Sequence, residues 1–407
     1  MQKRLKSLSF LNAYPKDAYV FMFASFMNST GSALMWPLIT LYVHNVLHRS
    51  YGEAGLVLFF QSFASMLGQF AGGGLYYKLG VKNLVIGSLI LQGCAQIGLI
   101  LAKAWLPYVG VMALNGFLMA ITMPTISAFI GFRWPKQQYR LFNVIYVSNN
   151  AGVAVGTTLA GILAAFSFNL TFALNGLSTF AFAAFFFVYF RRIDLSHGNN
   201  MNVGLSPYSE ETSTWTLLKN YRLYLFISLG SLLIWFSTSS WNSAVAPYLN
   251  QKGMSLSSYS FLWTLNGLMI LFGQPATTVY NRFVAKSLGS RLISSAFFYA
   301  LAFFFMWVCH GAYYDFVIGM LVATLGEMLI SPSIPALVAQ TTGASAPFYL
   351  GLVGGFGSVG RLAGPVLFGN LFDMFGISPI LLLTTAATFM AVLFFVVQKR
   401  LLHRQVA

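Results

Sequence analysis

The sequence predicts an all-α integral membrane protein in which twelve transmembrane helices form two pseudo-symmetric bundles of six. Hydrophobic residues make up 57% of the 407 residues and charged residues only 8%, whereas a soluble domain carries about 25% charged residues. An internal repeat at an offset of 208 residues relates Pro124–Ile130 (PTISAFI) to Pro332–Val338 (PSIPALV). In the same register the glycines of the first copy return in the second, at Gly152 and Gly360, Gly156 and Gly364, and Gly161 and Gly369. Such a duplication is typical of a membrane protein built from two related halves.

Apolar runs long enough to cross about 30 Å of hydrocarbon recur along the whole chain. In order, we expect the spans at residues 18–43, 54–77, 84–102, 108–130, 142–166, 171–190, 223–247, 259–281, 293–310, 316–339, 348–371 and 379–398. The polar stretch between the sixth and seventh spans contains His197–Gly204 (HGNNMNVG), a flexible composition. The sequence therefore predicts an N-terminal bundle over residues 1–190, a cytoplasmic linker over 191–222 and a C-terminal bundle over 223–407.

The basic residues predict the orientation of these spans. Of the 23 Lys and Arg residues, Arg49, Lys103 and Lys252 fall in loops on one side, Arg361 falls within a span, and the others lie on the opposite side. Because basic loops stay in the cytoplasm, we expect a multi-pass protein of the cell membrane with both termini cytoplasmic. The segment Met1–Asp17 lacks an apolar core followed by a cleavage site, so we expect a cytosolic lead-in instead of a removed signal.

The composition also excludes several classes of function. The net charge of +15 is spread over helix ends, so we expect no nucleic-acid partner. Cys94 and Cys309 lie in apolar stretches and predict neither a disulfide scaffold nor a metal site. The five histidines have no metal-ligand spacing, and no phosphate-binding glycine loop occurs. We therefore expect no metal, no cofactor and no enzymatic activity, since His, Asp and Cys do not cluster.

The segment Gly73–Asn83 (GGLYYKLGVKN) resembles the loop signature G-x-L-a-D-R-x-G-R-K of the major facilitator superfamily. The residues that fit are Gly73, Leu75, Gly80 and Lys82. Lys78 takes the place of an arginine, and Tyr77 takes that of the usual aspartate. The resemblance implies a gating role on the inward side for Gly73, Lys78, Gly80 and Lys82, with a lock that works without the aspartate.

Two further segments, Gly152–Gly161 and Gly360–Asp373, are similar to the glycine-rich antiporter motif of the twelve-helix drug/proton antiporter branch. The pair Gly326-Glu327 followed by Pro332, and Trp36-Pro37 in the first span, also fit bacterial multidrug members. The spacing of four places glycines on one helix face, where neighbouring helices approach closely. Either close helix packing or a hinge explains these glycines. A proline within a span can kink that span. The predicted hinge set is Gly152, Gly156, Gly360, Gly364 and Pro365.

Glu327 is the one acidic residue deep in a span. An ionisable group at mid-membrane costs about 2.5–3.5 kcal/mol and marks a functional site by default. Arg361 falls at a similar depth in the next span, so we expect the two to form an ion pair. The pair is interpreted as a proton-sensitive switch, and the alternative is a permanent ion pair that fixes helix register.

Neutral amides and aromatic residues within the spans suit an uncharged or amphipathic ligand, and aromatic faces can hold a cation. For any one of them, helix–helix hydrogen bonding or an interfacial aromatic belt is the alternative explanation. The predicted cavity wall consists of Asn28, Trp36, Tyr146, Asn149, Trp235, Trp241, Asn266 and Gln274.

The resemblance and the residues together favour a monomeric secondary transporter that exports a small amphipathic or lipophilic solute by proton antiport and alternating access. Met112 stands where the efflux branch usually has an arginine, four residues before Gly116. An uncoupled carrier therefore stays open, as does a proton-coupled carrier of a sugar, another nutrient or a lipid precursor. A receptor or scaffold is the alternative of another class.

Overall fold

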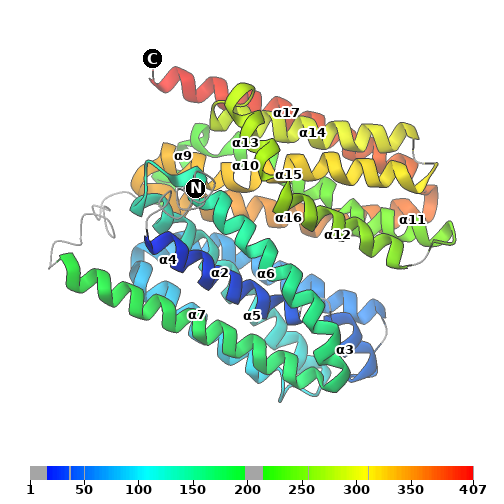
Figure 1. The fold of residues 1–407 in the computed structure, drawn as a ribbon, viewed down its shortest axis with the longest axis horizontal. Coiled ribbons are helices and arrows are strands. Elements are labelled where there is room, and N and C mark those ends of the chain that lie inside the picture. Colours follow the sequence, from blue (N-terminus) through cyan, green and yellow to red (C-terminus); the bar gives the residue numbers. More distant parts are fainter. Residues whose placement is uncertain are drawn as a thin grey trace, which may run out of the picture.

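The computed structural model describes residues 16–35, 38–49, 51–197, 214–254, 256–309 and 311–406. Within these ranges the helices gather in two bundles, drawn one below the other in Figure 1. Residues 16–197 form the first bundle and residues 214–406 form the second, here called the first half and the second half. The predicted all-α fold with two six-helix bundles is confirmed.

The first half runs through five long helices and one short one. They are α2 (Lys16–Met35), α3 (Ile39–Asn45), α4 (Tyr51–Gly98), α5 (Trp105–Arg133), α6 (Gln138–Phe166) and α7 (Phe168–His197). The last helix continues beyond residue 190, where the sequence predicts the end of the bundle. Most of the predicted linker, residues 198–213, lies outside the described residues.

The helices of the second half are interrupted more often. It contains α9 (Thr214–Lys219), η3 (Tyr221–Leu223), α10 (Leu225–Thr238), η4 (Trp241–Val245), α11 (Ala246–Gln251), α12 (Leu256–Phe272), α13 (Gln274–Phe283), α14 (Leu288–Cys309), α15 (Tyr313–Thr342), η5 (Gly343–Ser345), α16 (Ala346–Phe375) and α17 (Ser378–Val406). The seventh span is thus made of α10, η4 and α11, and the eighth of α12 and α13. The η4 segment is a π-helical turn, a distortion that is frequent at functional sites.

Six helical stretches of the described chain are long and apolar enough to cross a membrane. Two of them, Glu53–Gly98 with 46 residues and Tyr313–Phe375 with 63, are each long enough for two crossings. The first turns back at Gly80, whose φ of 72° and ψ of 160° break the helix. Glycine is required there because a positive φ strains other residues. The second turns back at η5, where Gly343 also has a positive φ.

The remaining predicted spans correspond to α2 with α3, α6, α10 with α11, and α12 with α13. They are interrupted or carry more polar residues, such as Asn149 and Asn150 in α6. A span with polar side chains has to face the interior of a bundle or a water-filled cavity. These helices are therefore the ones that a polar path between the halves would use.

The internal repeat has a counterpart in packing. In the first half α6 packs against α2, and in the second half α16 packs against α10. A Cβ added at Gly152 or Gly156 would collide with the backbone of Phe26 or Thr30 in α2. A Cβ added at Gly360 would collide with the carbonyl oxygen of Leu232 in α10. The repeated glycines thus let equivalent pairs of helices approach closely in the two halves.

One end of the molecule collects most of the Lys and Arg residues, and we call it the basic end. It contains the turn at Gly80, the connection between α5 and α6, the connection between α13 and α14, and η5. Both described chain ends lie there, at the left of Figure 1, and α3 and α11 lie at the opposite end. An aromatic cluster centred on Phe21 packs the first half near the basic end, with Phe129, Phe186 and Tyr189 around it.

Candidate functional site

Glu327 lies at the fifteenth of the 30 positions of α15, in the middle of its span. Both of its carboxylate oxygens accept hydrogen bonds. The Tyr146 hydroxyl donates to Oε1 at 2.8 Å, and the Asn266 amide donates to Oε2 at 2.9 Å. Tyr146 belongs to α6 of the first half and Asn266 to α12 of the second. The acidic side chain therefore joins the two halves in the middle of the membrane.

Neighbouring residues hold this arrangement in place. The Asn266 amide also donates to the Thr324 hydroxyl at 3.0 Å, one turn before Glu327 on α15. Gly326 lets α14 come close, since a Cβ there would lie 2.9 Å from both the Ser295 carbonyl oxygen and the Tyr299 ring. Glu327 itself stays partly exposed. It is thus positioned by packing and can still be reached by a small ion.

Arg361 lies at the sixteenth of the 30 positions of α16, at a matching depth. Its guanidinium stacks on the Trp235 ring, with Cζ 4.4 Å from the ring centroid, and Nη2 donates to the Ser358 hydroxyl at 3.3 Å. No ion pair joins Arg361 to Glu327; among the described residues the ion pair found is Arg49 with Glu53, at 3.2 Å. The expected pairing of Glu327 with Arg361 is therefore wrong for this conformation. The two residues lie at matching depths along their helices, as expected. Their side chains, however, do not point towards each other.

Between Glu327 and the basic end the halves are in direct contact. The Asn143 side-chain amide of α6 donates to Oε1, the side-chain oxygen of Gln274, at 2.9 Å. One turn closer to the basic end, the Asn281 amide of α13 donates to the Tyr139 hydroxyl at 3.0 Å. The Arg291 guanidinium covers the Tyr139 ring, with Cζ 3.9 Å from the centroid. This side of the site is closed by neutral amides and by a tyrosine whose ring is covered by the Arg291 guanidinium.

A second contact closes the other flank at the same end, between α4 and α16. A Cβ at Gly73 would lie 2.8 Å from the Pro347 carbonyl oxygen, and one at Gly351 would lie 2.5 Å from the Gln69 carbonyl oxygen. The Tyr77 hydroxyl donates to the Ala344 carbonyl oxygen at 3.3 Å. Between the two flanks, Gly131 of α5 meets Ala339 of α15, with 2.6 Å between a Cβ at residue 131 and the Ala339 Cβ. We call these contacts together the basic-end seal.

The predicted cavity residues separate into groups with different surroundings. Tyr146 and Asn266 bind Glu327, and Trp235 binds Arg361. Gln274 is part of the seal, and Asn149 accepts a hydrogen bond from Ser29 at 3.1 Å, which ties α6 to α2. Trp241 is 2% exposed and packs against Phe303, so in this structure it is a core residue and does not line a cavity. Trp36 lies outside the described residues.

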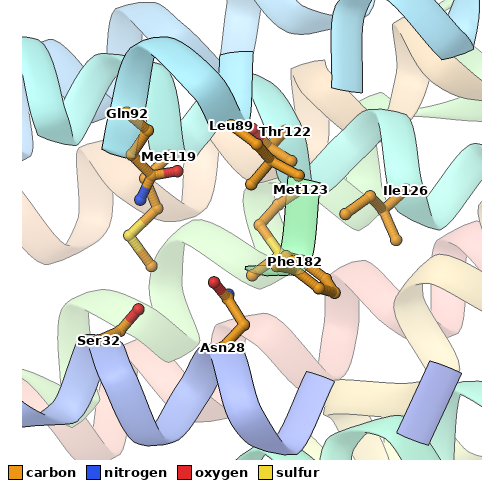
Figure 2. A pocket seen from close by; sticks show the side chains of 9 residues that line it. All are labelled: Asn28, Ser32, Leu89, Gln92, Met119, Thr122, Met123, Ile126 and Phe182. Atoms are coloured by element: carbon orange, nitrogen blue, oxygen red, sulfur yellow. The ribbon is translucent and has the colours of Figure 1, made fainter. Parts of the chain in front are cut away.

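Asn28 lines a small pocket within the first half, shown in Figure 2. The lining residues come from α2, α4, α5 and α7 and are Asn28, Ser32, Leu89, Gln92, Met119, Thr122, Met123, Ile126 and Phe182. Its volume of about 20 Å³ accommodates one water molecule or one small polar group. The buried Oδ1 of Asn28 has no hydrogen-bond partner, and the 4% exposed Gln92 points into the same space (Figure 2). The pocket is thus a polar niche in the wall of the first half, too small for a whole solute.

The predicted gating residues lie in two places. Gly73 is in the seal, and Gly80 makes the turn beside the exposed Lys78 and the partly exposed Lys82. The hinge set Gly152, Gly156, Gly360 and Gly364 packs α6 on α2 and α16 on α10. Pro365 lies inside α16, so the carbonyl of Arg361, four residues earlier, lacks its helical donor.

Sequence reasoning missed the seal residues Tyr139, Asn143, Asn281 and Gly131. The signal was present in part, because Tyr139, Asn143 and Tyr146 follow one another at helical spacing and so share a face of α6. Nothing in the sequence of α13 pairs Asn281 with Tyr139, since the two residues are 142 positions apart.

Comparison with known proteins gives a consistent result. The family model described as Major Facilitator Superfamily matches residues 21–365. The chain is 34% identical over 370 residues to YttB, an uncharacterized MFS-type transporter of Bacillus subtilis, covering 90% of this chain and 91% of that one. It is 22% identical over 367 residues to the quinolone resistance protein NorA of Staphylococcus aureus, covering 90% of this chain and 92% of NorA.

Solved structures share the fold at lower identity. A bacterial homologue of the iron transporter ferroportin in an outward-facing state has a TM-score of 0.75 at 12% identity, covering 95% of this chain and all of that one. The transporter FucP in the outward conformation has a TM-score of 0.71 at 14% identity, covering 95% and 99%. The predicted fold class is therefore supported by sequence and by structure.

Proposed function

Because this chain belongs to the major facilitator superfamily of transporters, we propose that it exports a small amphipathic or lipophilic solute, coupled to proton entry through Glu327. The observation that carries the proposal is the position of that carboxylate. It is at mid-span, partly exposed, and held by donors from both halves. A group that titrates at this place changes the contact between the halves themselves.

The proposed cycle follows from hydrogen-bond strength. A hydrogen bond to an ionised acceptor is roughly twice as strong as one between neutral groups. With Glu327 ionised, the Tyr146 hydroxyl binds the carboxylate firmly and the basic-end seal stays closed. A proton arriving from the opposite end neutralises Glu327 and weakens the link to Tyr146. The seal can then open towards the basic end, where the proton leaves and the solute enters.

The surroundings of the site suit an amphipathic solute. Trp235 and Tyr146 offer aromatic surface, and the Asn266 amide offers a neutral polar group. The similarity to the quinolone resistance protein NorA supports export and a drug-like solute. We further propose a monomer in the cell membrane, with the basic end and both termini in the cytoplasm.

The test is flux into proteoliposomes under an imposed pH gradient, with lipophilic fluorescent cations such as ethidium, neutral dyes and aromatic carboxylate dyes as probes. We expect gradient-driven movement of at least one probe by the unaltered protein. Glu327→Gln keeps the size of the side chain and one oxygen for Tyr146, but it cannot release a proton. This variant should therefore lose gradient-driven accumulation, while probe exchange without a gradient continues.

Asp373→Asn is the matched control, since Asp373 is an exposed acid near the end of α16. It should transport as the unaltered protein does. Accumulation that is equal in Glu327→Gln and in the unaltered protein would rule out coupling through this residue.

A further inference from the structure

Arg361 is a cation in the middle of a span, and among the acidic side chains that the structure describes none neutralises it. Glu53 pairs with Arg49, Asp315 caps the start of α15 through the Ala312 backbone amide at 2.8 Å, and Glu327 binds Tyr146 and Asn266. Asp373 is twelve residues further along α16, about 18 Å away at 1.5 Å per residue. A charge left unpaired at this depth is costly and is a functional site by default.

The packing of α16 shows which way Arg361 points. Gly351 and Gly354 face α4 of the first half, and Gly360 and Gly364 face α10 of the second half. At 100° per residue, Arg361 falls in the narrower sector between these two faces. Arg361 is therefore directed to the space between the halves, and the residue is exposed.

The guanidinium is also held in a defined orientation. Trp235 covers one of its faces at 4.4 Å, and Ser358 takes one of its five N–H donors. A Cβ at Gly357 would lie 2.8 Å from the Trp235 ring, so a glycine at this position lets the indole approach α16. The other donors of Arg361 stay available. The planar guanidinium can donate two parallel N–H hydrogen bonds to the two oxygens of a carboxylate.

We propose that Arg361 and Trp235 form an anion-binding subsite that takes the carboxylate of an aromatic, amphipathic solute. This inference rests on the proposed transport function and names the class of solute. The carboxylate oxygens receive the free guanidinium N–H donors, and the aromatic part of the solute lies along the indole and the open guanidinium face. Such a solute also supplies the negative charge that the protein itself does not place beside Arg361.

Binding to the full-length protein in detergent, at one pH and without a gradient, tests the subsite. The probes are two matched pairs, 1-naphthoate with 1-naphthamide and benzoate with benzamide, titrated by calorimetry. We expect 1-naphthoate to bind at least ~10-fold more tightly than 1-naphthamide, as a charge-assisted bidentate contact allows. Benzoate should show the same preference over benzamide at lower affinity, because its smaller ring covers less of Trp235.

Variants then assign the preference to this residue. Arg361→Gln should bind both members of a pair equally, and Arg361→Lys should retain a preference of only a few-fold because an ammonium lacks the planar donor geometry. As a control, Lys252→Gln removes a cation at the end of the molecule opposite to the basic end. It should leave the preference for the carboxylate over the amide unchanged. Thermal melting of each variant verifies that it is folded.

The proposal is overturned if neither carboxylate binds, if amides bind as tightly as carboxylates, or if the preference survives in folded Arg361→Gln. Because no gradient is applied, a failure of proton coupling leaves these binding results unaffected. The two proposals can therefore fail separately.

Discussion

At the scale of single residues, the site depends on which groups the side chains of two charged mid-span residues contact. Glu327 binds a tyrosine of the other half, and Arg361 binds a tryptophan of its own half. The sequence alone identifies both charges and their depth, because ionisable residues are rare in spans. It does not identify their partners, since helix rotation is set by packing that the sequence pattern leaves open. The ion pair predicted between them fails for this reason.

Removing the tyrosine hydroxyl tests the link between the halves. In Tyr146→Phe, Glu327 loses its donor from the first half, which costs about 1.5–3 kcal/mol for a hydrogen bond to a charged group. We expect the basic end to open roughly ten- to hundredfold more often, at 1.4 kcal/mol per factor of ten. The measurement is the rate of maleimide labelling of Ala339→Cys, a 5% exposed position in the seal, in a background where Cys94 and Cys309 are serine.

The control is Tyr313→Phe, whose hydroxyl donates to the Ser258 carbonyl oxygen within the second half. Labelling should not change in this variant. An unchanged rate in Tyr146→Phe would show that the hydrogen bond to Glu327 does not hold the seal closed.

At the scale of helices, the repeated glycines decide how closely α16 and α10 approach. The sequence predicted the glycine face but left packing and hinge motion as alternatives. The structure shows the close packing, through the contacts of Gly360 and Gly364 with α10. Pro365 next to this face frees a backbone acceptor, so hinge motion of α16 stays a prediction.

A pair of alanine substitutions separates packing from helix propensity. In Gly360→Ala the new methyl group meets the Leu232 carbonyl and lies 2.9 Å from the Phe236 amide nitrogen. Overpacking of this kind costs about 1–3 kcal/mol, so the melting temperature should fall. Gly369→Ala lies on the same helix with nothing within 4 Å of its Cβ, and it should melt at the same or a higher temperature. Equal melting of the two variants would contradict close packing at Gly360.

At the scale of the whole molecule, the conformation is closed at the basic end, with the seal running across α4, α5, α6, α13, α15 and α16. Composition and the repeat were sufficient to predict the two bundles and the order of the spans. They were not sufficient to predict the seal, because each of its contacts joins residues from different halves that are more than 130 positions apart, as with Asn143 and Gln274. Long-range pairs of neutral side chains leave no local pattern in a sequence.

A reversible cross-link across the seal tests whether this closure is a step of transport. Gly131→Cys with Ala339→Cys, in the background without Cys94 and Cys309, places two thiols where the Cβ atoms would overlap, at 2.6 Å. A small separation of α5 and α15 brings them to the roughly 3.5–4.5 Å that a disulfide needs. Oxidation should stop transport and reduction should restore it. Each single cysteine variant should be insensitive to oxidant, and transport that continues through the cross-linked protein would show that the halves need not part here.

The chemistry of the seal has a consequence for how the protein responds to the ionic strength of its surroundings. Its hydrogen bonds join amides, tyrosine hydroxyls and backbone carbonyls, with Tyr77 at the position where the related signature has an acid. At 0.1 M salt, dissolved ions largely screen exposed charges that lie more than about 10 Å apart and weaken exposed ion pairs, but they have little effect on bonds between neutral groups. The hydrogen bonds of the seal therefore keep nearly the same strength in dilute and in concentrated electrolyte.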